Sequence, residues 1–318
     1  MIPVAIVTGF LGSGKTTLIA RILRDPSFAR TAVIVNEFGE IGLDHELIAS
    51  SDETLLALTT GCLCCAVRSD LVATLLELLR RRAAGEIAYA RVLIETSGLA
   101  DPAPILHALM TDPEVAQHYS GAGVVTVVDV QQGEASIERY VEAQRQVALA
   151  DRLLLSKTDT AAPGEALLGR LAALNPGAGL LLARETAAAE LFTGIDPAGF
   201  VDRGQAGARH TSGIETFALR REQPIPALAL TLLLEALAEH CGARLLRMKG
   251  LVNIAEMPGQ PAVIHGVQHV VAPPEFLDRW PSADHTTRVV FIVRDVPRYF
   301  PSRLLDVIER EVAEEMQG

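Results

Sequence analysis

The stretch Gly9-Phe10-Leu11-Gly12-Ser13-Gly14-Lys15-Thr16 decides the fold of this 318-residue chain. It has the pattern G-x-x-x-x-G-K-[ST], follows the apolar run Pro3–Thr8 and opens a segment predicted to be helical from Lys15 to about Arg24. Glycines let such a loop turn tightly and aim its N–H groups at phosphate oxygens, and the helix start adds partial positive charge. The stretch therefore predicts a nucleotide phosphate loop; the alternative is a glycine-rich turn without a ligand.

The residue types of the phosphate loop predict separate contacts. The Lys15 ammonium is expected at the β- and γ-phosphates, the Thr16 hydroxyl at Mg²⁺ and Thr17 at the α-phosphate. The backbone supplies the other phosphate contacts, and the residues concerned are Gly9, Gly12, Ser13 and Gly14.

Lysine is rare in this chain. Of the 28 basic side chains only three are lysine, namely Lys15, Lys157 and Lys249. The two basic residue types are not equivalent, because a compact ammonium fits among phosphate oxygens where a planar guanidinium clashes. Lysine at two motif positions therefore carries more weight than an ordinary pattern match. Lys249 contacts either a phosphate or partner, or forms a simple salt bridge.

The segment Ser156-Lys157-Thr158-Asp159 is close to the Asn-Lys-x-Asp loop that recognises guanine. A carboxylate at Asp159 can accept two hydrogen bonds from guanine, whereas adenine offers no such pair of donors. The Lys157 stem can lie along the base, and Ser156 replaces the usual Asn. GTP is therefore the expected nucleotide; the alternative is a surface turn that contains Lys and Asp.

Short apolar runs alternate with amphipathic segments through the first 192 residues. This alternation predicts an α/β phosphate-loop NTPase domain with a parallel sheet covered on both faces. Ligands of such sheets bind at the carboxyl ends of the strands, where Gly9, Glu37, Glu95, Asp129 and Asp159 all fall. Strands are expected at Pro3–Thr8, Ala32–Asn36, Leu55–Thr59, Arg91–Glu95, Val124–Asp129 and Leu153–Ser156, and a further helix at Leu71–Ala84.

Two acidic segments follow predicted strands. Glu95 ends an apolar run in Glu95-Thr96-Ser97-Gly98, where a Mg²⁺-side carboxylate is expected, and the Gly98 N–H is a candidate ligand of the γ-phosphate. Gly98 is otherwise a turn glycine. Glu37 lies in an acidic segment that is either a nucleotide-sensing switch loop or a solvated loop. Lys15, Thr16, Glu95 and Gly98 form the predicted catalytic set.

The pattern changes after a Gly-, Ala- and Asp-rich linker at residues 193–211. Residues 212–318 predict a smaller α+β domain in which strands follow strands. Strands are expected at Ile214–Leu219, Ala243–Glu256, Ala262–Val271 and Arg288–Arg294, and helices at Pro226–Cys241 and Arg303–Met316. On the expected strand Ala262–Val271, His265 and His269 would face one side. The open alternatives for these two histidines are a role in metal binding, a role in packing and contact with a partner.

Three of the four cysteines lie within four positions, at Cys62, Cys64 and Cys65. Closely spaced thiolates are soft ligands that suit Zn²⁺, Co²⁺ or Cu⁺. The cluster precedes a predicted helix, whose N-terminus lowers thiol pKa. Glu37, a histidine or water would complete the site. The alternatives are small buried side chains or a redox thiol pair. Cys241 stands alone on an apolar helix and is expected in the core.

Composition excludes some functions. The net charge of −11 argues against nucleic-acid binding through a basic face. The chain begins Met1-Ile2-Pro3 without a signal-peptide pattern, and no apolar run spans a membrane, so we expect no membrane partner and a cytoplasmic location. Four cysteines in such a chain do not indicate a disulfide framework.

These motifs together resemble the CobW-type metallochaperone GTPases, relatives of the urease and hydrogenase nickel-insertion GTPases. The second half resembles the CobW C-terminal domain, including Arg247–Gly250 and His265–His269. The resemblance implies hydrolysis of GTP to GDP coupled to delivery of Zn²⁺, or Co²⁺ in cobalamin-linked members, to a client apo-metalloprotein. It implies that Cys62, Cys64 and Cys65 form the transfer site and that Glu37 is a metal or switch residue.

The chain departs from the family pattern at two places. Ser156 stands where the guanine-recognising loop usually has Asn. The linker, which is His-rich in many members, contains only His210, and this favours a single metal site over a role in metal storage. The same motifs leave other classes open. A small-molecule kinase would use the phosphate loop. A thiol redox-sensing GTP-binding protein would use the cysteines, and a non-catalytic interaction module would only bind GTP. The sequence leaves the metal, the client and the oligomeric state open.

Overall fold

The structure is a computed structural model that describes residues 1–36, 55–58, 64–192 and 213–315. The chain divides into two compact units, each with its own sheet and core. The first comprises Met1–Leu171 with Ala178–Ile195, and the second Ala172–Gly177 with Asp196–Gly318. The predicted linker lies outside the described residues, and the domain boundaries at its two ends remain predictions.

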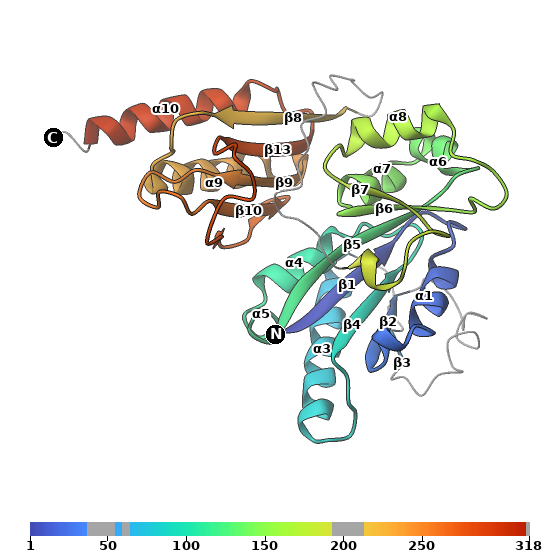
Figure 1. The fold of residues 1–318 in the computed structure, drawn as a ribbon. Coiled ribbons are helices and arrows are strands. Elements are labelled where there is room, and N and C mark those ends of the chain that lie inside the picture. Colours follow the sequence, from blue (N-terminus) through green and yellow to red (C-terminus); the bar gives the residue numbers. More distant parts are fainter. Residues whose placement is uncertain (37–54, 59–63, 193–212, 316–318) are drawn as a thin grey trace. The chain divides into compact units, whose positions relative to one another are not determined.

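A parallel sheet forms the centre of the first unit (Figure 1), which confirms the predicted α/β architecture. Its strand order is β3-β2-β4-β1-β5-β6-β7, and every pair of neighbours is parallel. Strands buried on both faces read as nearly continuous apolar runs, which is why the sequence predicted most of them. The strands are β1 (Ile2–Thr8), β2 (Thr31–Asn36), β3 (Leu55–Leu58), β4 (Arg91–Thr96), β5 (Tyr119–Asp129), β6 (Arg152–Ser156) and β7 (Gly179–Leu182).

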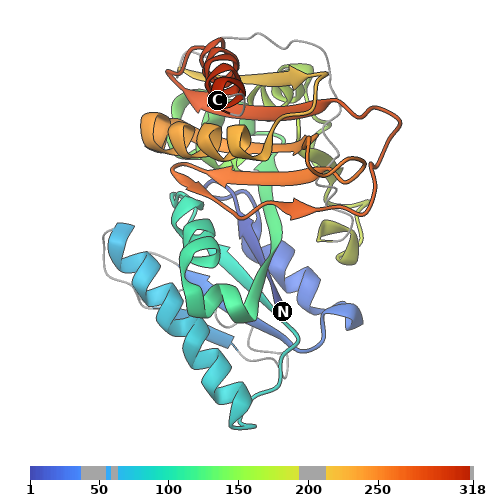
Figure 2. The ribbon, with the colours of Figure 1, turned by 90° about the vertical axis from the view of Figure 1, so that its left-hand side faces the viewer.

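Alternate side chains of β1 enter the two cores on opposite faces of this sheet. Val4 and Ile6 pack with α3, α4 and α5, whereas Ala5 and Val7 pack with α1. Figure 2 shows α3 and α4 side by side on the first of these faces. The helices of this unit are α1 (Lys15–Leu23), α3 (Cys64–Ala83), α4 (Ala103–Thr111), α5 (Pro113–His118), α6 (Gly133–Arg139), α7 (Val141–Ala148) and most of α8 (Glu165–Leu174), with short 3₁₀ turns η1 (Pro26–Phe28) and η2 (Ala189–Leu191).

A pair of buried tyrosines ties α3 to the sheet. The Tyr119 hydroxyl donates to the Leu75 carbonyl oxygen at 2.8 Å and lies 2.8 Å from the Tyr89 hydroxyl. Because Tyr119 has one proton and gives it to Leu75, Tyr89 must be the donor between the two phenols. Burial raises the pKa of Tyr119, so it stays protonated and keeps this donor role.

Removing the Tyr119 hydroxyl is expected to destabilise the protein. Tyr119→Phe leaves the buried Tyr89 hydroxyl without its acceptor, so the free energy of unfolding should fall by about 1–2 kcal/mol. Urea denaturation followed by circular dichroism measures this. Tyr299→Phe is the control, because Tyr299 is largely exposed and should change little. Equal midpoints for the two variants would show that the tyrosine pair adds no stability.

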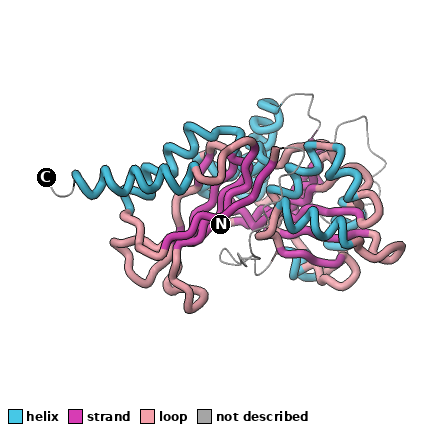
Figure 3. Tube along the Cα trace, turned by 90° about the horizontal axis from the view of Figure 1, so that it is seen from above, coloured by secondary structure: helices cyan, strands magenta, loops and turns pink. Residues whose placement is uncertain are grey.

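The second unit is an antiparallel sheet in the order β11-β10-β9-β13-β8, with β12 paired to β10. Its core gathers apolar side chains from these strands and from its two helices, which Figure 3 draws in cyan beside the magenta strands. Arg221 on β8 forms ion pairs with Asp306 and Glu309 on α10. The elements are β8 (Ile214–Arg221), α9 (Ala227–Cys241), η3 (Gly242–Arg244), β9 (Leu245–Val252), β10 (Ala262–Val267), β11 (Val270–Val271), β12 (Glu275–Phe276), β13 (Thr287–Arg294) and α10 (Phe300–Glu315).

Two element predictions were wrong. Ala262–Val271 is not one strand but a hairpin, because the chain reverses at Gln268, whose φ is 53°. His265 lies on β10 and His269 in the turn, so they do not share one side of a strand. Helix α3 begins at Cys64 rather than Leu71, so the last two cysteines of the cluster open the helix instead of preceding it.

Candidate functional site

The parallel strands bring the predicted nucleotide residues to one edge of the first sheet. In the register of the sheet, Val7 on β1 lies opposite Glu95 on β4, and Asp129 on β5 lies opposite Ser156 on β6. All four strands therefore end together, at the edge where the phosphate loop leaves β1. Glu37 lies outside the described residues.

The phosphate loop joins β1 directly to α1. Its close packing requires glycine at Gly9, where an added Cβ would lie 2.4 Å from the Val127 carbonyl oxygen. Gly14 precedes α1 with a φ of 96°, in the left-handed region that side chains with a Cβ rarely adopt. The loop thus leaves its strand and enters its helix through two positions that favour glycine. Gly12 on this loop and Thr17 in the first turn of α1 are exposed to solvent.

The Lys15 side chain folds back over the phosphate loop. Its ammonium nitrogen donates to the carbonyl oxygens of Gly9 at 2.9 Å and Phe10 at 3.3 Å, and the residue is buried. Burial of a positive charge is costly unless polar groups surround it. These two carbonyls hold the ammonium at the loop, where phosphate oxygens are expected.

Thr16 and Glu95 meet across the site. The Thr16 hydroxyl donates to the Glu95 carboxylate at 2.9 Å, and Glu95 is buried at the end of β4. A hydroxyl and a carboxylate are the oxygen ligands that Mg²⁺ takes in proteins. The structure therefore brings together the two side chains predicted to hold the ion.

Gly98 lies directly against the phosphate loop. A Cβ at this position would approach the backbone N and Cα of Leu11 within 2.8 and 2.9 Å. No side chain fits there without displacing backbone atoms, so the glycine is needed for this close approach. The segment that carries it, residues 97–102, is called the β4–α4 loop below.

The segment Ser156–Asp159, called the guanine loop below, is bonded to the phosphate loop. The Ser156 hydroxyl donates to the Ser13 carbonyl oxygen at 2.6 Å and approaches that of Val128 at 3.3 Å. Thus Ser156, although shorter than the usual Asn, links the guanine loop to the phosphate loop. Lys157 has a φ of 58°, and Asp159 is exposed to solvent.

Asp129 anchors Lys157. Its carboxylate lies 2.6 Å from the Lys157 ammonium and accepts a hydrogen bond from the Gln131 N–H at 2.7 Å. Asp129 is 5% exposed, so the carboxylate is held in one place while the lysine stem remains partly open to solvent. The sequence marked Asp129 only as a carboxylate at a strand end, and gave no sign that it would pair with the guanine loop.

The predicted cysteine site is described only in part. Cys62 lies outside the described residues, and Cys64 and Cys65 are the first two residues of α3. Within the described ranges, no group of three or more His, Cys, Asp or Glu residues could hold a metal ion. Cys241 is buried in the core of the second unit, as predicted, and burial raises the pKa of its thiol.

One cavity near the sheet of the first unit lies away from the motif edge. It has a volume of about 320 Å³, lies at the amino ends of the strands and has a mostly apolar lining that includes Phe28, Leu93 and Phe192. Its lining contains none of the phosphate-loop or guanine-loop residues, so volume does not identify the nucleotide site. None of the described helices is long and apolar enough to cross a membrane.

Two family descriptions match the chain. Residues 3–181 match the description "CobW/HypB/UreG, nucleotide-binding domain", and residues 214–308 match "Cobalamin synthesis protein cobW C-terminal domain". Together they cover most of both units.

Curated relatives are similar over about half of the chain. The zinc chaperone YjiA of Escherichia coli is 41% identical over 174 residues, which cover 55% of each chain. The zinc chaperone CobW of Sinorhizobium is 34% identical over 186 residues, or 50% of this chain and 51% of that protein. The zinc-regulated GTPase metalloprotein activator 1 of Saccharomyces cerevisiae is 33% identical over 181 residues, or 50% and 42%. The chain thus spans about half the length of the curated relatives it matches.

Solved structures extend the similarity to both units. The zinc-bound crystal structure of the E. coli YjiA GTPase superposes with a TM-score of 0.74 at 26% identity, covering 96% of this chain and 98% of that one. A zinc-bound triple mutant of the same GTPase gives a TM-score of 0.75, with coverage of 97% and 99%.

Proposed function

Because the chain belongs to the CobW/HypB/UreG family of nucleotide-binding proteins, we propose that it is a GTPase that binds Zn²⁺ and passes it to a client metalloprotein. The observation that carries the GTPase part is the meeting of the phosphate loop, Glu95, Gly98 and the guanine loop at one sheet edge. The metal part rests on the cysteine motif and on relatives that are named zinc chaperones.

Hydrolysis requires that the negative charge on the phosphate oxygens is stabilised and that the γ-phosphate is held in position. Lys15 and the N–H groups of the phosphate loop bind the phosphates, and the Gly98 N–H is a further donor. Thr16 and Glu95 would hold Mg²⁺, which when bound neutralises charge on the phosphate oxygens. Water attacks the γ-phosphorus, the bond to the bridging oxygen breaks, and GDP and phosphate leave. We expect slow turnover, because the sequence places no arginine finger or glutamine at the γ-phosphate.

The metal is the cargo of this cycle. Cys62, Cys64 and Cys65, with Glu37, form the proposed transfer site. The start of α3 at Cys64 supports thiolate chemistry there, because a helix N-terminus stabilises negative charge and lowers thiol pKa. Such a site would take Zn²⁺ and also Co²⁺, which prefer the same thiolate ligands.

GTP binding and metal binding are proposed to be coupled. The cysteines lie in sequence between Glu37 and Glu95, so loops that contact the γ-phosphate flank the metal motif. GTP orders these loops and closes the metal site, and hydrolysis releases them and opens it to the client. Coupling between binding sites is reciprocal, so metal should tighten GTP binding by the factor by which GTP tightens metal binding.

A Co²⁺ titration of the reduced protein tests the coupling. Thiolate-to-cobalt absorption is expected with Mg²⁺ and a non-hydrolysable GTP analogue, and should be several-fold weaker without nucleotide and abolished by excess Zn²⁺. Cys64→Ala should remove the bands, because it removes a proposed ligand. Cys241→Ala is the matched control, since that thiol is buried in the core of the second unit, and should leave them intact.

Two outcomes would contradict the proposal. Bands that persist in Cys64→Ala would place the metal elsewhere. Equal metal affinity with and without the GTP analogue would show that nucleotide and metal binding are independent.

A further inference from the structure

Two consecutive side chains of α7 hold the β4–α4 loop. The side-chain amide nitrogen of Gln146 lies 3.1 Å from the Gly98 carbonyl oxygen and 3.0 Å from that of Ala100. The Arg145 guanidinium lies 3.1 Å from the Asp101 carboxylate. Neither residue belongs to a nucleotide-binding motif, and the sequence did not single them out.

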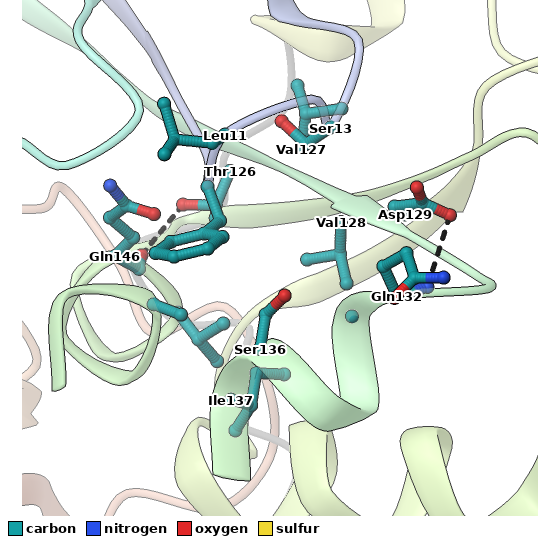
Figure 4. A pocket seen from close by; sticks show the side chains of 14 residues that line it. Leu11, Ser13, Thr126, Val127, Val128, Asp129, Gln132, Ser136, Ile137 and Gln146 are labelled. Carbon is teal, nitrogen blue, oxygen red and sulfur yellow. Dashed lines mark hydrogen bonds between the residues drawn. The ribbon is translucent and has the colours of Figure 1, made fainter. Parts of the chain in front are cut away.

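Gln146 is fixed at both its side chain and its backbone. It is 1% exposed, and its own carbonyl oxygen accepts a hydrogen bond from the Thr126 hydroxyl on β5 at 2.7 Å, the contact that Figure 4 marks beside the small cavity under the phosphate loop. Both side-chain partners are carbonyl acceptors, so the amide must present its NH₂ group to them. Among the described residues its amide oxygen has no hydrogen-bond partner, although it is buried. The amide group of Gln146 therefore donates two hydrogen bonds to this loop, while its buried oxygen accepts none from the described residues, at a cost in free energy.

The two carbonyls that Gln146 holds lie on a tight turn. The Ala100 N–H donates to the Ser97 carbonyl oxygen at 3.0 Å, which closes the turn. The Ser97 C=O and the Gly98 N–H belong to the same trans peptide group, in which the two bonds point in opposite directions. Because the Ser97 C=O points toward the Ala100 N–H, the Gly98 N–H points away from it. Gly98 itself lies against Leu11 of the phosphate loop. The orientation of the turn therefore sets where the Gly98 N–H points.

The segment before α7 also contacts the phosphate loop. The rings of Tyr140 and Phe10 stack with their centroids 4.7 Å apart, and Tyr140 immediately precedes α7. One short helix with its preceding residue thus contacts both loops expected to surround the terminal phosphate.

From this geometry we propose that Gln146, assisted by Arg145, is a positioning residue that holds the Gly98 N–H toward the terminal phosphate of bound GTP. The proposal rests on the proposed GTPase function. GDP lacks this phosphate, so the contribution of Gln146 is specific to the triphosphate and to its hydrolysis.

Gln146→Leu removes both hydrogen bonds at similar side-chain volume. We expect kcat for GTP to fall about 10- to 100-fold, the range for losing one preorganised donor or less. Affinity for a non-hydrolysable GTP analogue should fall about tenfold, and affinity for GDP should stay within about threefold, because the helix and the other phosphate contacts remain. Arg145→Met should have a smaller effect in the same direction, since the ion pair with Asp101 is partly exposed.

Gln144→Leu is the matched control. Gln144 is a second buried glutamine on α7, but its amide donates to the Ile137 carbonyl oxygen at 2.7 Å and not to the β4–α4 loop. Both variants remove a buried amide from one helix, so loss of stability should be comparable. Only Gln146→Leu should lose the preference for the GTP analogue over GDP.

Calorimetric binding of GDP and the GTP analogue, with phosphate release as the activity readout, separates the outcomes. If both glutamine variants behave alike, or if Gln146→Leu weakens GDP and the analogue equally, the positioning role is overturned. If wild-type protein binds neither nucleotide or releases no phosphate with Mg²⁺ and Zn²⁺ present, the proposed function fails instead.

Discussion

Replacing Lys15 by alanine is expected to lower the rate of GTP hydrolysis by about a thousandfold, the upper range for removing one electrostatic group from a preorganised site. The ammonium is buried and is held at the phosphate loop by the carbonyl oxygens of Gly9 and Phe10. Its charge offsets the negative charge that accumulates on the β- and γ-phosphate oxygens during bond cleavage.

Lys15→Arg is the informative companion to this variant. It keeps the positive charge but places a wide planar group where the structure holds a compact ammonium. We expect it to recover little of the lost turnover. Phosphate release under saturating GTP and Mg²⁺ measures both variants, with thermal unfolding as the check on folding. If the turnover of Lys15→Ala stayed within about threefold of wild type, the loss would be too small for a residue that binds phosphate.

Asp159→Asn is expected to change which base the protein accepts. The Asp159 carboxylate would accept hydrogen bonds from the N1–H and the 2-amino group of guanine. An amide in its place can accept only one of these and turns a donor toward the other. The loss of hydrogen bonds to a charged group should lower kcat/KM for GTP by about a thousandfold.

The same substitution should create activity toward XTP. Xanthine carries a carbonyl oxygen where guanine carries the 2-amino group, and the new amide can donate to it. We expect kcat/KM for XTP to rise within about tenfold of the wild-type value for GTP. Asp159→Ala is the control, because it removes the acceptor without complementing xanthine and should lose GTP without gaining XTP. Unchanged GTP preference in Asp159→Asn would show that this loop does not contact the base.

The fold of the first unit could be predicted because its decisive signals are local. Apolar runs bounded by turn residues identified strands β1, β2, β4 and β6 nearly to the residue, and glycine spacing identified the connection from β1 to α1. The parallel arrangement then placed Gly9, Glu95 and Asp129 at one edge, since strands of one direction end together. That step needs topology but no knowledge of side-chain contacts.

Other elements were mispredicted for identifiable physical reasons. The helix was predicted from Leu71, but it continues back to Cys64 through Ser69 and Asp70, residue types that are more typical of a helix start than of its interior. The hairpin at residues 262–271 turns at Gln268, a residue type that carries no turn preference. In the structure, Cys64 and Cys65 therefore lie in the helix, and His265 and His269 lie on different elements.

The contacts of α7 had no signal in the sequence at all. Gln146 is one polar residue on a short helix, and its partners lie 46 and 48 positions away in the chain. Long-range hydrogen bonds of this kind depend on how two loops approach one another, which local pattern does not encode. Asp129 was visible as a strand-end carboxylate, but its pairing with Lys157 also required the fold.

The hydrogen bond from Ser156 to the Ser13 carbonyl oxygen has a mechanical consequence. The Ser156 hydroxyl lies 2.6 Å from its acceptor and the contact is buried, so one short bond joins the guanine loop to the phosphate loop. Separating the loops would leave buried polar groups without a partner, which costs free energy. We therefore expect the two loops to shift as one body, so that a change at the guanine loop is transmitted directly to the phosphate loop.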